Sequence, residues 1–185
     1  ATSLTYTLVQ ADVGSVITVI ASYTDGQDTV ESVTSSATDA VANVNDAPTG
    51  AVTISGTARE DETLTASNNM ADEDGLGNIS YQWNRGGAAV SGATNGTYTL
   101  TQIDVGSVIT VTASYTDGEG ATESATSAAT TAVANVNDAP TGVVMIRGTA
   151  IEDKILMAIN NLADEDGLGA ISYQWNRGGN NIAGA

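Results

Sequence analysis

Acidic and amide side chains gather in short loops of this 185-residue chain, and their oxygens are the groups best placed to do chemistry. The loop Asp72-Glu73-Asp74-Gly75 returns as Asp164-Glu165-Asp166-Gly167, and the string Asn-Asp-Ala-Pro begins at Asn45 and again at Asn137. Such oxygens are ligands for hard cations, and Ca²⁺ takes about six to eight of them in a flexible geometry. Mg²⁺ fits less well, because it demands octahedral geometry and keeps its waters. The loops therefore predict calcium sites.

The composition excludes most other kinds of catalytic and binding site. The chain carries 22 acidic and 5 basic residues, a net charge of −17, and neither His nor Cys. Without His and Cys it cannot build Ser/His or Cys/His nucleophile pairs, the usual zinc sites or disulfides. Its few basic residues are scattered, which argues against binding to nucleic acids or anionic membrane surfaces. No apolar run approaches the roughly 20 residues that a membrane span needs.

A repeat of 92 residues runs the length of the chain, since the segment 6–26 returns almost unchanged at 98–118. If the Asn-Asp-Ala-Pro linker marks the start of a domain, residues 46–137 form one complete domain. Residues 1–45 then form the C-terminal half of a repeat, and residues 138–185 form the N-terminal half of another. Alone, each half is expected to expose an apolar sheet face and unpaired strand edges.

Short runs of β-branched residues between turn signals predict an all-β fold, an immunoglobulin-like sandwich of about seven strands per repeat. In the complete repeat the expected strands are 51–55, 63–68, 79–83, 97–101, 107–115 and 121–133. Ile79, Tyr81 and Trp83 alternate on one face, which is typical of a half-buried strand. Trp83 and its counterpart Trp175 are therefore predicted in the core and not on a sugar-binding platform.

This fold places the acidic loops at the two ends of each sandwich. The leading end of the complete domain is expected to hold Asp46, Asp72, Asp74 and Asp117. The trailing end is expected to hold Glu60, Asp61 and Asp104. Stacking domains head to tail brings the two groups together across each linker. Unpaired carboxylates would repel one another there, and a bound Ca²⁺ ion resolves the repulsion.

The predicted calcium ligands of the whole chain follow from the same geometry. They are Asp25, Asn45, Asp46, Glu60, Asp61, Asp72, Asp74, Asp104, Asp117, Asn137, Asp138, Glu152, Asp153, Asp164 and Asp166, with Asn135 beside them at the second linker. The alternative is that these are ordinary acidic surface loops in which Asp-Gly pairs serve turns. A glycosidase-like pair is disfavoured, because Asp72 and Asp74 share one loop with no aromatic platform. We predict that the chain is not an enzyme.

The segment 56–124, from GTAREDETL to GATES, resembles the immunoglobulin-like tandem repeats of large bacterial RTX-type adhesins exported by type I secretion. The resemblance covers the whole chain, since both halves belong to the same repeat. It implies an extracellular stalk on a bacterial cell surface. The linker Asn43-Val44-Asn45-Asp46-Ala47-Pro48 is similar to the calcium-binding linker of cadherins, although Ala42 and Asn43 stand where that family has a further Asp.

These observations predict a structural spacer that is rigidified by Ca²⁺ at its linkers and assembled head to tail with neighbouring copies. In such an assembly Asp25 of one copy approaches Asp164 and Asp166 of the next. The alternative is an immunoglobulin-like module that binds a glycan or a protein. A ligand-binding domain should vary in its loops, whereas the loops are among the most repetitive parts of this chain.

Overall fold

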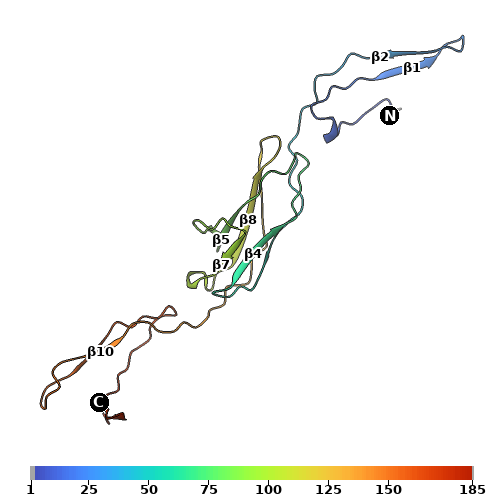
Figure 1. Ribbon diagram of the computed structural model, residues 1–185. Coiled ribbons are helices and arrows are strands. Elements are labelled where there is room, and N and C mark those ends of the chain that lie inside the picture. Colours follow the sequence, from blue (N-terminus) through green and yellow to red (C-terminus); the bar gives the residue numbers. More distant parts are fainter. Residues whose placement is uncertain (1–2, 185) are drawn as a thin grey trace.

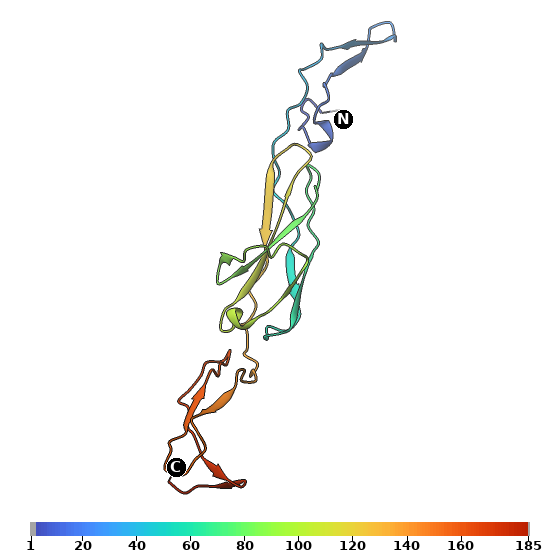
Figure 2. The same ribbon diagram turned by 60° about the vertical axis from the view of Figure 1, so that its left-hand side comes forward.

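The computed structural model describes residues 3–184, and these form three bodies in a row (Figure 1). We call residues 3–45 the first body, residues 46–137 the middle body and residues 138–184 the third body. Figure 2, turned by 60°, shows the same extended row with the two ends of the chain in the outer bodies. The first and third bodies therefore do not fold onto each other within one chain.

The middle body is a sandwich of two antiparallel sheets. One sheet has the order β3-β4-β7, formed by β3 (Val52–Ser55), β4 (Thr63–Asn68) and β7 (Thr97–Thr99). The other has the order β6-β5-β8-β9, formed by β5 (Ser80–Arg85), β6 (Ala88–Ala89), β8 (Ile109–Thr116) and β9 (Thr122–Thr126). The all-β class predicted from the sequence is confirmed.

The last predicted strand, 121–133, is shorter than expected, because β9 ends at Thr126. Beyond it, the side-chain oxygens of Ser127 and Thr130 accept the backbone N–H groups of Val111 and Ile109, each at 3.0 Å. These side chains take the place of carbonyl groups in the ladder, so that the segment stays extended without forming a regular strand. It then meets the other parts of the body through isolated parallel bridges at 133 and 134.

The core lies between the two sheets and is formed by alternate residues of the strands. Along β8 every second residue is buried, which aims Ile109, Val111 and Ala113 at the opposite sheet. Trp83 is fully buried, as predicted, and its ring stacks on that of Tyr98 with the centroids 5.7 Å apart. The indole N–H donates to the backbone oxygen of residue 95 at 2.8 Å, so the polar atom of this core side chain is paired.

The outer bodies carry short two-stranded sheets, one in the first body and two in the third. Their elements are η1 (Gln10–Asp12), β1 (Ile20–Thr24) and β2 (Val30–Thr34) in the first body, and β10 (Val144–Arg147), β11 (Met157–Asn160), β12 (Asn176–Arg177) and β13 (Asn180–Asn181) in the third. Tyr23 is 55% exposed, whereas its counterpart Tyr115 in the middle body is 4% exposed. Trp175 is only half-buried, which differs from the core position predicted for it, because fewer strands surround it among the described residues than surround Trp83.

Helical structure contributes little to the fold. The described residues contain η1 and η2 (Gln102–Asp104), each a single 3₁₀ turn. No helix within residues 3–184 has the length and apolar character needed to cross a membrane.

Candidate metal centre

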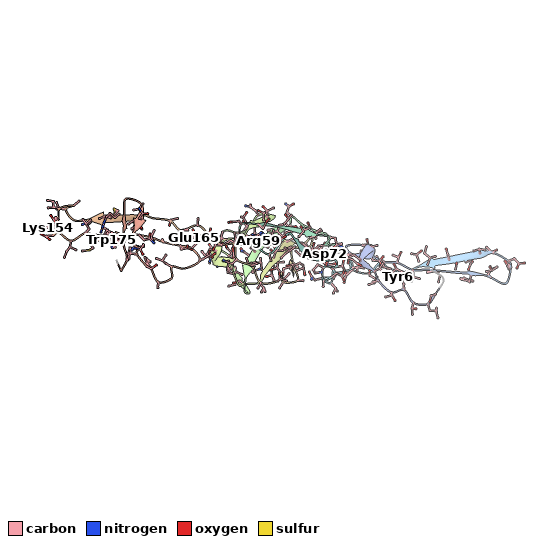
Figure 3. All side chains as sticks on the ribbon, turned by 90° about the horizontal axis from the view of Figure 1, so that it is seen from below. Tyr6, Arg59, Asp72, Lys154, Glu165 and Trp175 are labelled. Carbon is pink, nitrogen blue, oxygen red and sulfur yellow. The ribbon has the colours of Figure 1, made fainter. Side chains whose placement is uncertain are left out.

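Three carboxylates meet at the second junction, where the middle body joins the third. Glu60 comes from the turn between β3 and β4, Asp138 from the linker and Glu165 from the loop after β11. Each offers an oxygen that lies within 4.8 Å of the others. Figure 3 shows Glu165 at the end of the third body that faces Arg59 of the middle body. The cluster thus draws one acidic group from each of the three parts of the junction.

Glu60 is held rigidly at the trailing end of the middle body. Its side chain is 3% exposed, and one carboxylate oxygen accepts the N–H of Val136 at 3.0 Å. With its amide nitrogen turned toward Glu60, Gln102 donates to the two carboxylate oxygens at 2.7 and 3.0 Å. The backbone N–H of Glu60 donates to the oxygen of Ala134 at 2.9 Å. A buried carboxylate in this setting is a pre-positioned ligand.

Asp138 has a carboxylate oxygen, Oδ2, that is buried and accepts no hydrogen bond. Buried polar atoms are nearly always paired, and a bare carboxylate oxygen is a natural ligand for a hard cation. The backbone N–H of Asp138 donates to Asp166 at 2.8 Å, and this bond fixes the linker against the loop of the third body. The same carboxylate of Asp166 accepts the N–H of Asp138 on Oδ2 and the Asn135 amide on Oδ1.

The contacts of Asp166 explain why the pKa of its carboxylate is lowered. The side-chain amide of Asn135 lies 2.6 Å from Oδ1 of Asp166, and this bond, followed by the N–H of Asp138, lowers the pKa of Asp166. Asp164 supports the same loop, because its Oδ1 accepts the N–H of Asp166 at 3.0 Å. Asp164 and Asp166 therefore shape the loop that presents Glu165.

No ion pair within residues 3–184 neutralises the junction carboxylates, since the one ion pair found there joins Arg85 to Asp104 inside the middle body. Like charges held this close in a partly buried setting repel each other. A divalent cation would remove the repulsion and use the bare oxygen of Asp138. A search against protein-family models, curated proteins and solved structures finds no match to this chain. What this junction can bind is therefore inferred from its own chemistry.

The first junction brings together the leading-end residues predicted from the sequence. Asp74 is 7% exposed and accepts the N–H of Asp46 at 2.7 Å and the amide of Gln10 at 2.9 Å. The N–H of Asp46 is the main cause that lowers the pKa of Asp74; burial opposes it, and the side chains of Asn43 and Gln10 add to the lowering. Asn43 also keeps a buried amide oxygen without a hydrogen-bond partner.

Asp72 and Asp117 complete this leading-end group. The carboxylate of Asp72 accepts the N–H of Asp74 at 2.8 Å and the hydroxyl of Tyr115. Asp117 is nearly buried, and its Oδ2 accepts no hydrogen bond, as at Asp138. The backbone N–H of Gly118 donates to the backbone oxygen of Asp74 at 3.0 Å, which ties the two loops together.

The position 92 residues before Glu60 lies outside this sequence, so that a counterpart of Glu60 is not among the described residues of the first junction. Its counterpart of Gln102 is Gln10, which here donates to Asp74. Within residues 3–184 the group of three carboxylates is found at the second junction. We therefore take the second junction as the candidate metal centre.

The structure does not bring Asp104 to this site, which corrects its assignment to the calcium ligands. Asp104 is fully buried, with Oδ1 2.6 Å from Nε of Arg85. The hydroxyl of Tyr98 donates to it at 2.9 Å, and the N–H and hydroxyl of Thr101 donate to it at 2.9 and 3.0 Å. Burial raises the pKa of Asp104, but Arg85, Thr101 and Tyr98 outweigh it and leave the pKa lowered. Asp104 thus caps η2 and forms an internal ion pair.

Two amides and one acid that the sequence predicts as calcium ligands lie at the edges of the junctions. Asn45 donates to Glu123 at 2.8 Å and so links the first linker to β9. Asn137 donates to the backbone oxygen of Asp138 at 2.9 Å. Asp61 is exposed beside Glu60 and has a φ of 65°, a conformation that Asp tolerates in tight turns.

The remaining predicted ligands lie at the outer tips of the molecule. Asp25 is in the loop between β1 and β2, where its Oδ1 accepts two backbone N–H groups of that loop. Glu152 and Asp153 are exposed in the turn before Lys154, which Figure 3 places at the far end of the third body. Within one chain these three residues are therefore not part of a junction.

Proposed function

We propose that this chain works as an extracellular spacer whose domains are stiffened by Ca²⁺ bound at their junctions. The observation that carries the proposal is the cluster of Glu60, Asp138 and Glu165. Because these residues come from the middle body, the linker and the third body, one ion held by all three would tie the parts together. We also propose that the chain is not an enzyme.

The architecture of the middle body supports the immunoglobulin-like part of this proposal. Its sheets have three and four antiparallel strands, and Trp83 lies in the core on the long strand β5. This arrangement, with about seven strands and a core Trp, is typical of immunoglobulin-like sandwiches. Such domains can repeat end to end when their termini lie at opposite ends. Figure 1 shows the middle body joined to the two outer bodies at its opposite ends.

Stiffening follows from the chemistry of the linker. Without an ion, repulsion among the carboxylates favours conformations in which the third body swings away from Glu60. With an ion, the three carboxylates share one positive centre and the linker loses its freedom. Extracellular calcium modules have dissociation constants of about 0.1–1 mM, so that such a spacer would be stiff only where calcium is abundant. This dependence favours a location outside the cell, on a bacterial surface.

The test measures the motion between bodies directly. The chain has no Cys, so that spin labels can be attached to Ser124→Cys and Ala150→Cys, both at exposed positions of the middle and third bodies. Diluted into unlabelled chain, the labels should give a narrow distance distribution in 10 mM Ca²⁺ and a broad one in EDTA. Glu60→Gln should abolish the narrowing, whereas Glu62→Gln, the same change at an exposed neighbour, should preserve it. Equal distributions with and without Ca²⁺ would refute the stiffening.

A further inference from the structure

We propose that two copies of this chain pair side by side through one face of the β10-β11 sheet, with the strands of the two copies antiparallel. We call this the outward face, because its counterpart in the middle body points away from the core. Figure 1 shows β10 in the third body. The pairing goes beyond the proposed spacer function and needs no calcium.

The opposite, inward face of this sheet repeats that of the middle body. At the offset of 92 residues, β10 is the counterpart of β3 and β11 that of the last four residues of β4, and both pairs of strands share one register. The apolar side chains that this region of the middle body turns inward return unchanged as Val144, Ile146, Leu156 and Ala158. The inward face therefore keeps the residues of a sandwich core.

The outward face shares no residue with its counterpart. In the middle body its five positions are all Ser or Thr and all exposed: Thr53, Ser55, Thr63, Thr65 and Ser67. In the third body the same positions carry Met145, Arg147, Ile155, Met157 and Ile159. Because this face is open in the complete sandwich of the middle body, completing a sandwich does not cover these side chains.

The apolar side chains of the outward face form one exposed surface. Met145 is 46% exposed, Met157 60% and Ile155 88%. Ile159 lies opposite Met145 in the ladder and joins the same surface. Large apolar side chains that point away from the core add nothing to the burial within their own sandwich. Exposed apolar patches of this kind mark surfaces that bind a partner.

The differences between the two repeats are concentrated on this face. The segments 71–87 and 163–179, which follow β4 and β11, differ only where Ala170 replaces Asn78. The loops and the strand that carries the core Trp are thus unchanged, while all five outward positions have changed. The change affects a surface and leaves the fold as it is.

Two of the five basic residues of the chain border the apolar surface. Arg147 stands at the end of β10, where the middle body has Ser55. Lys154 stands in the turn before β11, where the middle body has Glu62. Neither cation has an ion-pair partner within residues 3–184. The outward face therefore fits a partner that is apolar with an acidic border.

A second copy of the chain supplies both features when it is antiparallel. The ladder of the third body runs from Arg147 at the outer tip toward the acidic loop 164–166 at the junction. Lys154 and Asp164 lie five positions to either side of Ile159 along the chain. A two-fold axis near Ile159 therefore lays the basic tip of each copy on the acidic loop of the other. A parallel pair would set the two acidic loops side by side, where they repel.

An anionic lipid surface fits the outward face less well. Such a surface would attract Arg147 and Lys154, but it would repel the rest of a chain with a net charge of −17. The contact between two copies is small, because it uses one face of a short two-stranded sheet. Interfaces below about 1,200 Å² are typical of weak, transient contacts, so we expect a monomer–dimer equilibrium.

The first experiment measures this equilibrium by sedimentation in EDTA. The wild-type chain should dimerise as its concentration rises. Met145→Thr combined with Met157→Thr restores two residues of the middle body and should weaken the dimer at least about 100-fold, because two apolar side chains lose their burial. Val144→Thr makes the same kind of change on the inward face of β10 and should leave the dimer at the wild-type level.

Two outcomes of this experiment would overturn the proposal. One is a wild-type chain that stays monomeric up to about 1 mM, the weak limit of ordinary association. The other is a dimer that Val144→Thr weakens and the outward pair of variants does not, since that dimer would use the inward face.

A charge variant tests the acidic border of the contact. Lys154→Glu restores the residue of the middle body and should weaken the dimer at least about 10-fold, because it places an acid against the acidic loop of the other copy. Arg177→Glu makes the same charge change on β12, in another sheet of the third body, and should leave the dimer unchanged. Equal weakening by both variants would show a general charge effect and contradict the antiparallel arrangement.

The orientation is tested by a crosslink at Lys154, which is the one lysine of the sequence. A carbodiimide joins its amine to a touching carboxylate as an amide and takes up the water that is lost. In a mixture of ¹⁵N-labelled and unlabelled chains, mass spectrometry should find hybrid links from Lys154 to the loop 164–166. Hybrid links to Glu152 or Asp153 instead would show a parallel pair, and an absence of hybrid links would likewise overturn the proposal.

Vesicles of phosphatidylglycerol test the lipid alternative. Co-sedimentation with these vesicles by a chain that stays monomeric would assign the outward face to a lipid surface and overturn the pairing. The pairing and the calcium proposal also fail separately, because stiffening is measured within one labelled chain. Dimerisation in EDTA without a calcium effect on the distance would leave the pairing and remove the stiffening. A calcium effect without dimerisation would do the reverse.

Discussion

Asp104 is fully buried with its Oδ1 2.6 Å from Nε of Arg85, at the corner that leads into β8. The arginine side chain is 29% exposed, so that water screens the pair only in part. This pair closes the turn of η2 against β5, at the opposite end of that strand from the residues near Asp72. It is a structural element of the middle body and not part of the proposed calcium site.

Replacing this carboxylate should destabilise the middle body. Asp104→Ala leaves the guanidinium of Arg85 without its partner, and we expect a loss of about 3 kcal/mol, the low end of the range for one side of a buried ion pair. Urea unfolding followed by Trp83 fluorescence in a Trp175→Phe background measures it. Asp12→Ala makes the same change where no arginine is present and should leave the middle body unchanged in dilute solution. Equal losses in the two variants would contradict this assignment.

The core role of Trp83 predicts a large effect of its removal. Trp83→Ala takes away a fully buried side chain and its stacking on Tyr98, at an expected cost of about 3–5 kcal/mol. Trp175→Ala should cost far less in dilute solution, because the ring is only half-buried. Far-UV circular dichroism in urea compares the two. A small loss for Trp83→Ala would place that ring outside the core.

The junction should weaken in acid. The pKa of Asp166 is lowered in the folded chain, so that Asp166 contributes stability above the pKa of the unfolded chain, about 3.9. This contribution is lost as the pH falls through the lowered folded pKa. Because the Asn135 amide is the main cause, Asn135→Ala should raise the pKa of Asp166 toward its ordinary value. Asp74 should keep its own lowered pKa in the same variant.

Carboxylate ¹³C chemical shifts measured by NMR across the acid range follow both titrations. An unchanged pKa of Asp166 in Asn135→Ala would show that the amide contact is not what lowers it. A parallel rise at Asp74 would point to a general change in the chain and would likewise contradict the local cause.

The sequence predicts the features that depend on the local alternation of apolar and polar residues along a strand. Alternation along 79–83 is enough to place Trp83 in the core, and the number of short β-branched runs between turns is enough to predict a sandwich. The convergence of Asp72 and Asp74 with Asp46 follows from the order of strands and loops. The end of β9 was missed, because side-chain acceptors at Ser127 and Thr130 replace the ladder, and strand propensity does not report that.

The site depends more on contacts between distant parts of the chain. Asp104 looked like a junction residue because only the pairing of β5 with β8 brings Arg85 to it. Glu165 was passed over in favour of its two Asp neighbours. Asp166 contacts the linker too, but the Asn135 amide and the N–H of Asp138 occupy its two carboxylate oxygens. Glu165 is the residue of this loop whose carboxylate lies beside Glu60 and Asp138. The recurrence of Glu165 as Glu73 was visible in the repeat but does not reveal its direction.

The calcium dependence of the stability of the middle body tests the central claim most directly. Urea unfolding in EDTA and in 10 mM Ca²⁺ should show a gain of about 1–3 kcal/mol in the wild-type chain, from a site with a dissociation constant of about 0.1–1 mM. Glu62→Gln should show the same gain, and Glu60→Gln should lose most of it, because Glu60 is the buried ligand of the cluster. No gain in the wild-type chain, or an undiminished gain in Glu60→Gln, would contradict a calcium site at this junction.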